Sequence, residues 1–540
     1  MKYLLIAIAA ALLFIPFLGS VHLFEWDEIN FAEAAREMIV SHNYSQVQIG
    51  FQPFWEKPPL FIWMQAGSML LFGVSDFAAR FPNALIGIAT LVSLFAIGKK
   101  LADDRLGLWW VLIYAGSWLP HFYFKSGIID PAFNYFIFLS VYFAYRIAWH
   151  RKPSRMAVFS GIFLGLAVLT KGPVAILVAL LTLLVYWLWN KGRITIRFLH
   201  IGLIALCAII TTSLWFGYEI TAHGWRFVNE FVVYQVRLLT TADAGHDGPF
   251  YYHWVVLLLG CFPASIFLFT YFQGKRKSIY HRHQAAEVRD FRVWMWMLCW
   301  VILILFSIVK TKIVHYSSGC YLPLSFLAAY QVYRISEGRL RLQGWTITLL
   351  LITGLLLGTA ITLLPVAGIY VHKLIPLIGD KFAAANLQAQ VSWSATEICY
   401  GIGYTLLIII CTVMLYRQKI TNGLIGLFTG TIITIQLTIV HFTPKIERYS
   451  QGAVIDFFIS LQGRDVYVKT LGYHSYGQYY YSRMQPPGNK HYYNTGWLLK
   501  GAVDKPVYFV SRNTDSGIYR QNPDLEVIGE KNGYVFFKRK

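Results

Sequence analysis

The chain has 540 residues, of which 56% are hydrophobic and only 14% are charged. Soluble proteins carry about 25% charged residues because their surfaces must be hydrated, so this composition excludes an ordinary soluble protein. The formal net charge is +20, but no basic cluster in a soluble segment indicates nucleic-acid binding, and we expect no nucleic-acid partner.

Apolar runs of about twenty residues, the length that crosses a hydrocarbon core, follow one another along most of the chain. The first run, Tyr3–Val21, lacks the cleavage site of a secretory signal, so we expect a retained helix. The pattern predicts an all-α polytopic membrane domain with about thirteen transmembrane helices. The expected spans cover residues 3–21, 60–98 (an interfacial piece plus one span), 107–123, 131–148, 156–170, 173–189, 199–217, 252–273, 294–309, 315–333, 344–366, 395–416 and 421–442.

The loops between alternate spans are basic, as the positive-inside rule requires of cytoplasmic loops. This pattern places Met1 in the cytoplasm and everything after about Phe442 outside. Three polar segments are then external, at residues 22–59, 126–131 and 218–251. In the first of them, apolar residues recur at helical spacing between positions 31 and 39, so we expect an amphipathic helix along the membrane surface.

The character of the sequence changes after the last span. Short alternating stretches at residues 465–469, 506–510 and 533–537 are bounded by Gly, Pro and Asn, as strands are. Helices are expected between them, near residues 452–461 and 475–481. We therefore predict two domains, a membrane domain over residues 1–443 and a small, soluble α/β domain over residues 444–540.

Three polar signals fall on the predicted external face at the edge of the apolar runs. They are Asp27-Glu28, Trp55-Glu56-Lys57-Pro58-Pro59 and Asp130-Pro131. Each has an ordinary structural explanation: a solvated loop carboxylate, a snorkelling lysine before a helix, and a helix N-cap. Ionisable groups are costly near the bilayer, so three signals on one face favour a functional site.

Carboxylates and a lysine at an external membrane surface suit one kind of reaction. A sugar on a lipid phosphate already has a good leaving group, so a base for the incoming hydroxyl and cations for the phosphate are what the reaction needs. Asp27 or Asp130 could be that base, and Lys57 could hold the phosphate.

The segments Asp27–Met38 and Trp55–Pro59 resemble the first-loop motifs of the bacterial family-39 glycosyltransferases. These are GT-C membrane enzymes that include the transferase adding aminoarabinose to lipid A. The resemblance extends to Asp130 and to further motifs at His246–Tyr252, Lys310–Tyr316 and Tyr321–Pro323. It implies an inner-membrane enzyme that transfers a sugar, with inversion, from a polyprenyl-phosphate donor at the periplasmic face. The acceptor would be lipid A, another envelope glycan or a protein.

The resemblance also implies roles for individual residues. Asp27 would be the catalytic carboxylate, with Asp130 as its acidic partner and Glu28 beside it. Lys57 matches a donor-phosphate position. The cavity-lining positions would be Tyr316, His315 and Trp55, while Glu56 and His246 match positions associated with a divalent metal such as zinc.

The sequence departs from the family at Asn30, where an Arg is common. One phosphate-binding cation is therefore missing, and Arg36, Arg237, Lys310 or Lys312 could replace it. A transporter or flippase is the main alternative, and it would show inverted repeats and broken helices at the midplane. A non-catalytic scaffold and a protein O-glycosyltransferase of the same class also remain open.

Overall fold

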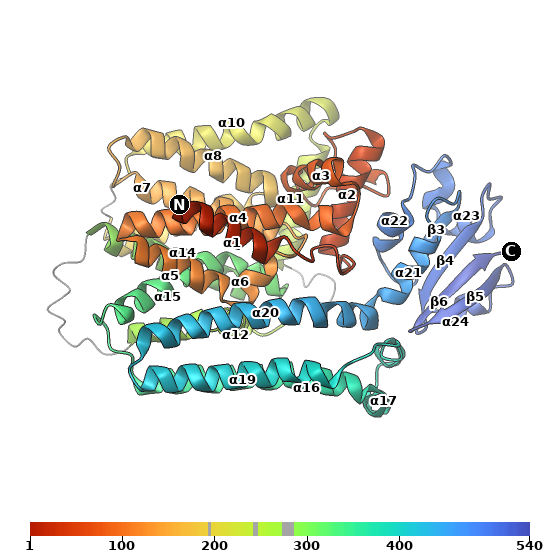
Figure 1. Cartoon of the computed structure of the whole chain (residues 1–540). Helices are drawn as coiled ribbons and strands as arrows, with labels where there is room; N and C mark the ends of the chain where they lie inside the picture. The colour runs from red at the N-terminus through yellow and green to blue at the C-terminus, as the bar shows by residue number, and fades with distance from the viewer. Residues whose placement is uncertain (193–195, 241–246, 273–285) are drawn as a thin grey trace.

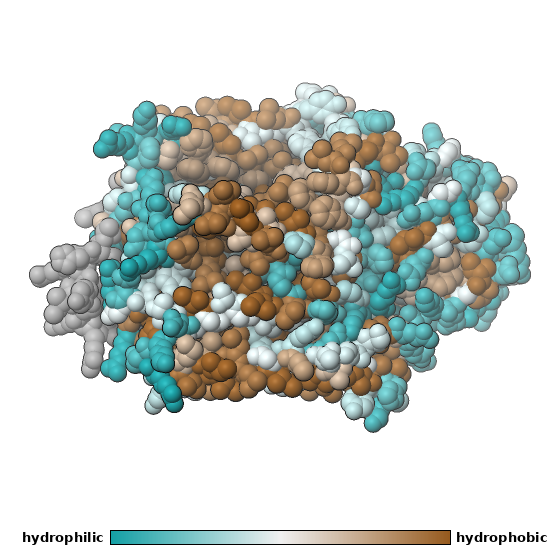
Figure 2. Space-filling view, in the orientation of Figure 1, coloured by the Kyte–Doolittle hydropathy of each residue, from teal (hydrophilic) through white to brown (hydrophobic). Residues whose placement is uncertain are grey.

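A computed structural model describes residues 1–192, 196–240, 247–272 and 286–540. Long helices run in roughly the same direction and form one bundle, and the C-terminal strands lie beyond one end of it (Figure 1). An apolar belt surrounds the bundle on the face seen in Figure 2, with hydrophilic residues at both ends. This distribution is the one that a bilayer imposes on a multi-pass protein.

The helices of the bundle and its external connections are α1 (Lys2–Phe14), α2 (Asp27–Ser41), α3 (Leu60–Phe72), α4 (Asp76–Leu101), α5 (Asp104–Ala115), α6 (Trp118–Tyr123), α7 (Asp130–Arg146), α8 (Pro153–Lys171), α9 (Val174–Trp189), α10 (Phe198–His223), α11 (Arg226–Thr240), α12 (Tyr252–Gly260), α13 (Ala264–Leu268), α14 (Ala286–Ile308), α15 (Tyr321–Ser336), α16 (Gly344–Ile369), α17 (Val371–Leu374), α18 (Lys381–Asn386), α19 (Ala395–Tyr416) and α20 (Ile420–Ser450). Short 3-10 helices include η2 (Phe269–Phe272) and η4 (Val314–Cys320), and β1 (Gln48–Ile49) pairs with β2 (Gln52–Pro53) in the first external segment.

The structure shows a helical bundle with several apolar spans, but it does not confirm their exact number. Within the described ranges, seven helices are long and apolar enough to cross a membrane, or eight if α12 and the α13–η2 segment, bent by 107°, form one span. The predicted count of about thirteen is therefore not confirmed. Several apolar runs are interrupted: the run at 60–98 divides at Gly73, which has φ +77°, and the run at 107–123 divides between α5 and α6.

Helix α2 forms where the sequence predicts an amphipathic helix, but its polar face is not open to solvent: both its apolar residues and its polar residues Glu33, Arg36 and Glu37 are buried. Its position along the membrane surface stays a prediction. One hydrophobic cluster contains residues of α2, of α3 and of the C-terminal segment, including Ile29 and Val454. The C-terminal segment therefore covers the face of α2 that the sequence pattern assigns to solvent.

The C-terminal segment contains a four-stranded sheet in the order β3-β4-β6-β5. Its strands are β3 (Tyr467–Leu471), β4 (Val507–Arg512), β5 (Leu525–Lys531) and β6 (Tyr534–Arg539), and its helices are α21 (Gly452–Ser460), α22 (Gly477–Ser482), α23 (Thr495–Lys500) and α24 (Gly517–Arg520). Strands β3 and β4 are parallel, while β6 is antiparallel to both β4 and β5. The strands expected at 465–469, 506–510 and 533–537 are present as β3, β4 and β6. Helix α20 continues through Ser450, across the domain boundary expected at residue 444, so the two-domain division stays a prediction.

Candidate active site

A cavity of about 960 Å³ opens at the end of the bundle that faces the C-terminal segment. Its wall combines residues of the first external segment with the ends of several bundle helices and with His474 and Tyr476. The sequence-predicted residues that line it are Asp27, Glu28, Glu56, Lys57, Asp130, Arg237, His315 and Tyr316. The structure thus brings together residues that are up to 289 positions apart in the chain.

Two carboxylates and two basic side chains form the polar centre of the cavity. The Nε2 atom of His315 lies 3.2 Å from Oδ2 of Asp27 and 3.9 Å from Oδ2 of Asp130. The other carboxylate oxygen of Asp130 accepts a 2.5 Å ion-pair hydrogen bond from Nζ of Lys171. The Asp27 side chain is 35% exposed and that of Asp130 only 4%, so the Asp27 carboxylate is the one open to the cavity.

Helix ends place three of these side chains. Asp27 and Asp130 are the first residues of α2 and α7, where the helix dipole favours an anion, and Lys171 is the last residue of α8, where it favours a cation. Gly172 then turns the chain with φ +94°, and a Cβ atom at this position would lie 2.4 Å from the ring of Phe231. Glycine therefore allows α8 to end beside α11.

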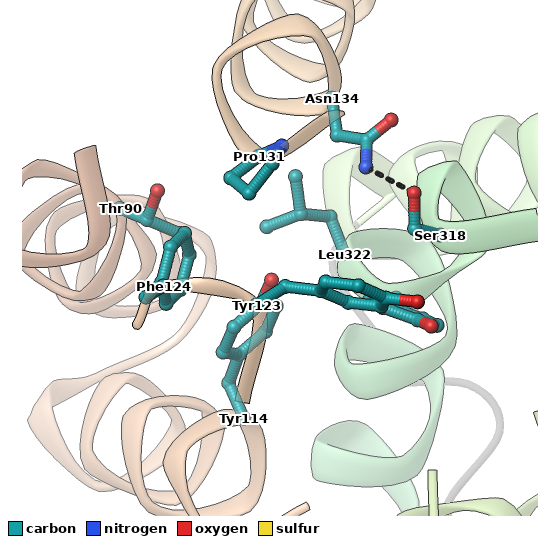
Figure 3. A pocket seen from close by; sticks show the side chains of 9 residues that line it. Thr90, Tyr114, Tyr123, Phe124, Pro131, Asn134, Ser318 and Leu322 are labelled. Carbon is teal, nitrogen blue, oxygen red and sulfur yellow. Dashed lines mark hydrogen bonds between the residues drawn. The ribbon is translucent and has the colours of Figure 1, made fainter. Parts of the chain in front are cut away.

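A small cavity behind the polar centre shows how two of its elements are joined. It holds about 10 Å³, which is space for one water molecule and not for a substrate (Figure 3). Asn134 of α7 donates a 2.8 Å hydrogen bond across it to Ser318 of η4. Ser318 in turn donates to the carbonyl of His315 at 2.5 Å. This chain of bonds links the helix of Asp130 to the segment of His315.

A second pair of cations lines the same cavity. Nζ of Lys57 lies 5.1 Å from the ring centroid of Tyr234, and the guanidinium of Arg237 lies 5.2 Å from the same ring. Burial lowers the pKa of Lys57 from its ordinary value, although the nearby carboxylates of Glu56 and Asp27 oppose this shift. The arrangement presents two cations beside the carboxylates, as recognition of a phosphate requires.

Glu28 lines the cavity but is not free to act as a base. Its carboxylate accepts two hydrogen bonds from Arg80, at 2.9 and 2.8 Å, and two more from the backbone N–H groups of Phe24 and Gly127. Burial alone would raise its pKa, but the Arg80 charge and these hydrogen bonds lower it. The prediction of Glu28 as a catalytic carboxylate is therefore corrected: it anchors the first external segment to α4.

Two predicted phosphate ligands point elsewhere. The guanidinium of Arg36 donates to both oxygens of Glu33 at 2.7 Å and to the carbonyl of Met484 at 2.8 Å, and it is buried away from the cavity. Nζ of Lys312 is buried against the C-terminal end of α14, where it donates to the carbonyls of Phe306, Ser307 and Val309. Both predictions are corrected because these cations already have structural partners.

The remaining predicted residues differ in whether they line the cavity. Trp55 does not line the cavity; its ring packs on Phe227, 5.7 Å between centroids, and under Arg226. Asn30 lines the cavity as an uncharged residue. His246 lies outside the described residues, and within the described residues no group of three or more His, Cys, Asp or Glu side chains could hold a metal ion.

Three residues of this site are not among the predicted site residues. Lys171 stands in a Lys-Gly-Pro turn, and its charge beside an apolar run is a signal, but nothing local marks Asp130 as its partner. His474 and Tyr476 lie in a tyrosine-rich stretch far from the membrane runs, and only the docking of the C-terminal segment brings them to the cavity.

Comparison with known proteins agrees with this geometry. Residues 56–216 match the family model for dolichyl-phosphate-mannose-protein mannosyltransferases. The chain is 25% identical over 422 residues to the undecaprenyl phosphate-α-4-amino-4-deoxy-L-arabinose arabinosyl transferase of Pectobacterium atrosepticum, which covers 73% of this chain and 72% of that protein. It is 26% identical over 428 residues to arabinosyl transferase 2 of Pseudomonas fluorescens, which covers 75% and 74% of the two chains.

The fold is similar to a solved structure. The crystal structure of ArnT from Cupriavidus metallidurans bound to undecaprenyl phosphate superposes with a TM-score of 0.79 and 16% identity, over 99% of this chain and 97% of that one. These findings confirm the family resemblance that the motifs predict: the chain is similar to the bacterial aminoarabinose transferases over about three quarters of its length and has the GT-C fold of ArnT.

Proposed function

We propose that this chain is a glycosyltransferase of the bacterial inner membrane that transfers a sugar from an undecaprenyl-phosphate donor to lipid A. The observation that carries the proposal is the cluster of Asp27, Lys57 and Arg237 around one large cavity, in a chain similar to transferases that use undecaprenyl-phosphate aminoarabinose. The cavity meets the reaction's two needs, a carboxylate for the acceptor and cations for the donor.

Asp27 is the better candidate for the base. The charge of Asp130 is neutralised by Lys171 in a buried pair, whereas Asp27 faces the cavity and has only His315 within ion-pair distance among the described residues. In the proposed reaction Asp27 takes the proton of the acceptor hydroxyl while the oxygen of this hydroxyl attacks the anomeric carbon of the donor sugar. The bond from this carbon to the phosphate oxygen breaks, the electron pair leaves with undecaprenyl phosphate, and the anomeric centre is inverted.

Lys57 and Arg237 would bind the phosphate as its charge develops. Both come from external segments, and Tyr234 between them keeps their side chains at similar distances from one ring. Arg237 also supplies the cation that the sequence lacks at Asn30. Lys171 is a further cation at the cavity wall, although its short ion pair assigns it first to Asp130.

Orientation and domain organisation follow the same proposal. The basic loops would face the cytoplasm, and the cavity and the C-terminal α/β domain would face the periplasm. Ion pairs join the N-terminus and two of these loops at one end of the bundle: Lys2 and Lys99 bind Asp104, and Arg105 binds Glu337. A single shared end is what the positive-inside assignment requires.

A divalent metal near Glu56 and His246 stays a prediction of the sequence. Two ligands are too few for a structural zinc site, so we derive no step of the reaction through a metal. Metal analysis of the purified wild-type chain, with Glu56→Ala and His246→Ala variants beside it, tests the prediction directly. Stoichiometric zinc that both variants lose would support it, and a metal content that both retain would contradict it.

Two alternatives are less favoured. A protein acceptor is suggested by the name of the matching family, but the match covers residues 56–216, while the aminoarabinose transferases match about three quarters of the chain. A transporter would place its charged groups at the midplane of the bundle. Here they gather at one end, beside residues of the C-terminal segment.

Mass spectrometry of envelope lipids tests the proposal. Source cells that express wild-type chain, Asp27→Asn or Asp465→Asn at equal levels are compared; Asp465 is an exposed carboxylate of the C-terminal segment and serves as the control. We expect an aminopentose-sized mass on lipid A in the wild type and the control, and its loss in Asp27→Asn. If no strain, wild type included, carries this mass on lipid A, the lipid acceptor is wrong, and glycoprotein analysis decides between a protein acceptor and no transferase. If all three strains carry it, Asp27 is not the base.

A further inference from the structure

The C-terminal segment reaches the backbone immediately before the proposed base. Both oxygens of the Glu25 carboxylate are bound by it: one accepts from the hydroxyl of Ser475 and the other from the backbone N–H of Tyr476 at 2.9 Å. Ser475 is buried, so its hydroxyl has no access to solvent as an alternative partner. Glu25 is two residues before Asp27.

The backbone on the N-terminal side of Glu25 is held from the same direction. The N–H of Glu25 donates to the side chain of Gln451 at 3.1 Å, and that side chain donates to the carbonyl of Leu23 at 2.7 Å. The N–H of Leu23 donates to the hydroxyl of Tyr481 at 2.6 Å. Leu23 and Glu25 are thus bonded to Gln451 just before α21, to α22 and to the loop before α22.

The residue between this anchored stretch and Asp27 has an unusual conformation. Trp26 has φ +70° and ψ −102°, a region that non-glycine residues adopt only when their surroundings hold them there. Its ring lies 5.5 Å from that of His474 and 5.8 Å from that of Tyr476, and both of these rings line the cavity. Burial, and next the charge of Glu56, raise the pKa of Tyr476 above its ordinary value.

We propose that the loop His474–Tyr476 is a positioning element of the active site, which holds Trp26 and therefore Asp27 in place through the carboxylate of Glu25. The start of α2 has no side-chain cap, so Asp27 lacks the local fixing that a capped helix would provide. The Glu25 bonds supply that fixing from the C-terminal segment. The proposed role of this element is to act on the base and not on the reacting atoms. The expected effect on turnover rests on the proposed function, whereas the expected effect on the order of the backbone near Asp27 does not.

We call the two bonds between the Glu25 carboxylate and the loop His474–Tyr476 the clamp. Three variants of the chain in detergent test it. Glu25→Ala removes both bonds. Glu25→Gln keeps an oxygen for the Tyr476 N–H and an NH2 group that the Ser475 hydroxyl can accept, so it is the conservative rescue. Tyr493→Phe removes a 3.0 Å hydrogen bond to the carbonyl of Gly50, which joins the same two segments away from Asp27, and it is the matched control.

The first measurement is hydrogen exchange of the peptide covering residues 22–31, which needs no activity. We expect faster exchange in Glu25→Ala, and wild-type exchange in Glu25→Gln and Tyr493→Phe. Unchanged exchange in Glu25→Ala would overturn the clamp. Equal acceleration in Tyr493→Phe would also overturn it, since the effect would then be general loosening of the C-terminal segment.

The second measurement is turnover with undecaprenyl phosphate aminoarabinose and lipid A. A displaced base lowers kcat without weakening donor binding. We therefore expect kcat of Glu25→Ala to fall on the order of 10-fold or more, with KM for the donor within about twofold of wild type. Glu25→Gln should recover most of the rate. A wild-type chain that is inactive with these substrates would refute the proposed function and leave the exchange result to decide the clamp. An active wild type with an equally active Glu25→Ala would refute the clamp alone.

Discussion

The imidazole of His315 lies between the two carboxylates of the site, with Nε2 at 3.2 Å from Asp27 and 3.9 Å from Asp130. Like charges repel, and Asp27 is on an external segment while Asp130 begins a bundle helix. His315 therefore supplies a bridge that sets the distance between an exposed carboxylate and a buried one. Ser318 and Asn134 hold the backbone of His315 on the side away from the cavity.

This relationship makes His315 a positioning residue for Asp27. We expect His315→Ala to lower kcat on the order of 100-fold, because small displacements of a catalytic group have large effects on rate. The dissociation constant for undecaprenyl phosphate should change less than about threefold, since the phosphate cations are elsewhere. Steady-state kinetics with a parallel binding titration checks both expectations.

The control for His315 is a histidine at the edge of the same region. His474→Ala removes a cavity-lining ring that has no ion pair with either carboxylate among the described side chains. It should lower kcat less than His315→Ala. If His315→Ala weakens donor binding and leaves kcat unchanged, then His315 contacts the donor and the bridging role is wrong.

A second expectation concerns the buried pair of Lys171 and Asp130. Removing one partner of a buried pair leaves an uncompensated charge, so Lys171→Met should destabilise the chain by about 3–5 kcal/mol. The double variant Lys171→Met/Asp130→Asn removes both charges and should regain most of this stability. Thermal unfolding in detergent measures each variant. A double variant less stable than Lys171→Met would mean that the two side chains do not act as a pair.

The sequence pattern predicts the fold class better than its details. Apolar runs show a membrane protein, because the requirement for burial in lipid acts on every residue of a span. The exact count of spans is not confirmed, because an apolar run does not reveal where each helix ends: Gly73 has φ +77° and ends α3 within the run that is expected to hold an interfacial piece and one span. Three of the four strands of the C-terminal sheet are predicted, because alternation and turn residues are local signals; β5 is not.

The sequence motifs predict several residues that line the cavity. They do not predict which of these residues are bound by structural partners, because those partners are distant in the sequence. Asp27, Lys57 and Asp130 line one cavity, as the motifs suggest. Glu28 carries the same chemistry as Asp27, yet its carboxylate faces Arg80, and no sequence pattern separates these two neighbours. The helical pattern of α2 predicts the helix but not the burial of its polar face, because the segment that covers this face is more than 400 residues further along the chain.

The Glu28–Arg80 pair gives an expectation for stability at low pH. The folded state lowers the pKa of Glu28 below its unfolded value, so its contribution is present above that unfolded value, about 4.3, and is lost as the pH falls through the folded value. Glu28→Gln should lose about 3–5 kcal/mol at neutral pH, because Arg80 is left buried without its anion. It should also show a smaller further loss between pH 5 and pH 3 than wild type.

Unfolding midpoints from pH 7 to pH 3 check the Glu28 expectation. Glu526→Gln, an exposed residue of β5, is the control and should follow the wild-type curve. A Glu28→Gln chain that is as stable as wild type but inactive would restore Glu28 to the catalytic group.

The last expectation uses the lysine that faces the donor phosphate. Burial lowers the pKa of Lys57, and the opposing carboxylates of Glu56 and Asp27 cancel only part of that shift. As pH rises, Lys57 should lose its proton below the ordinary lysine value of about 10.4, so affinity for undecaprenyl phosphate should decline at a lower pH than a surface lysine would give. Lys57→Arg keeps the charge at all these pH values and should remove the decline, although the different shape of the guanidinium lowers affinity throughout. Binding titrations between pH 7 and pH 10.5 separate the two effects, with Lys505→Arg at the distant Asp465 pair as the control. A decline that persists unchanged in Lys57→Arg would mean that another group, such as Lys171, carries the titration, and that Lys57 is not the phosphate ligand that limits binding.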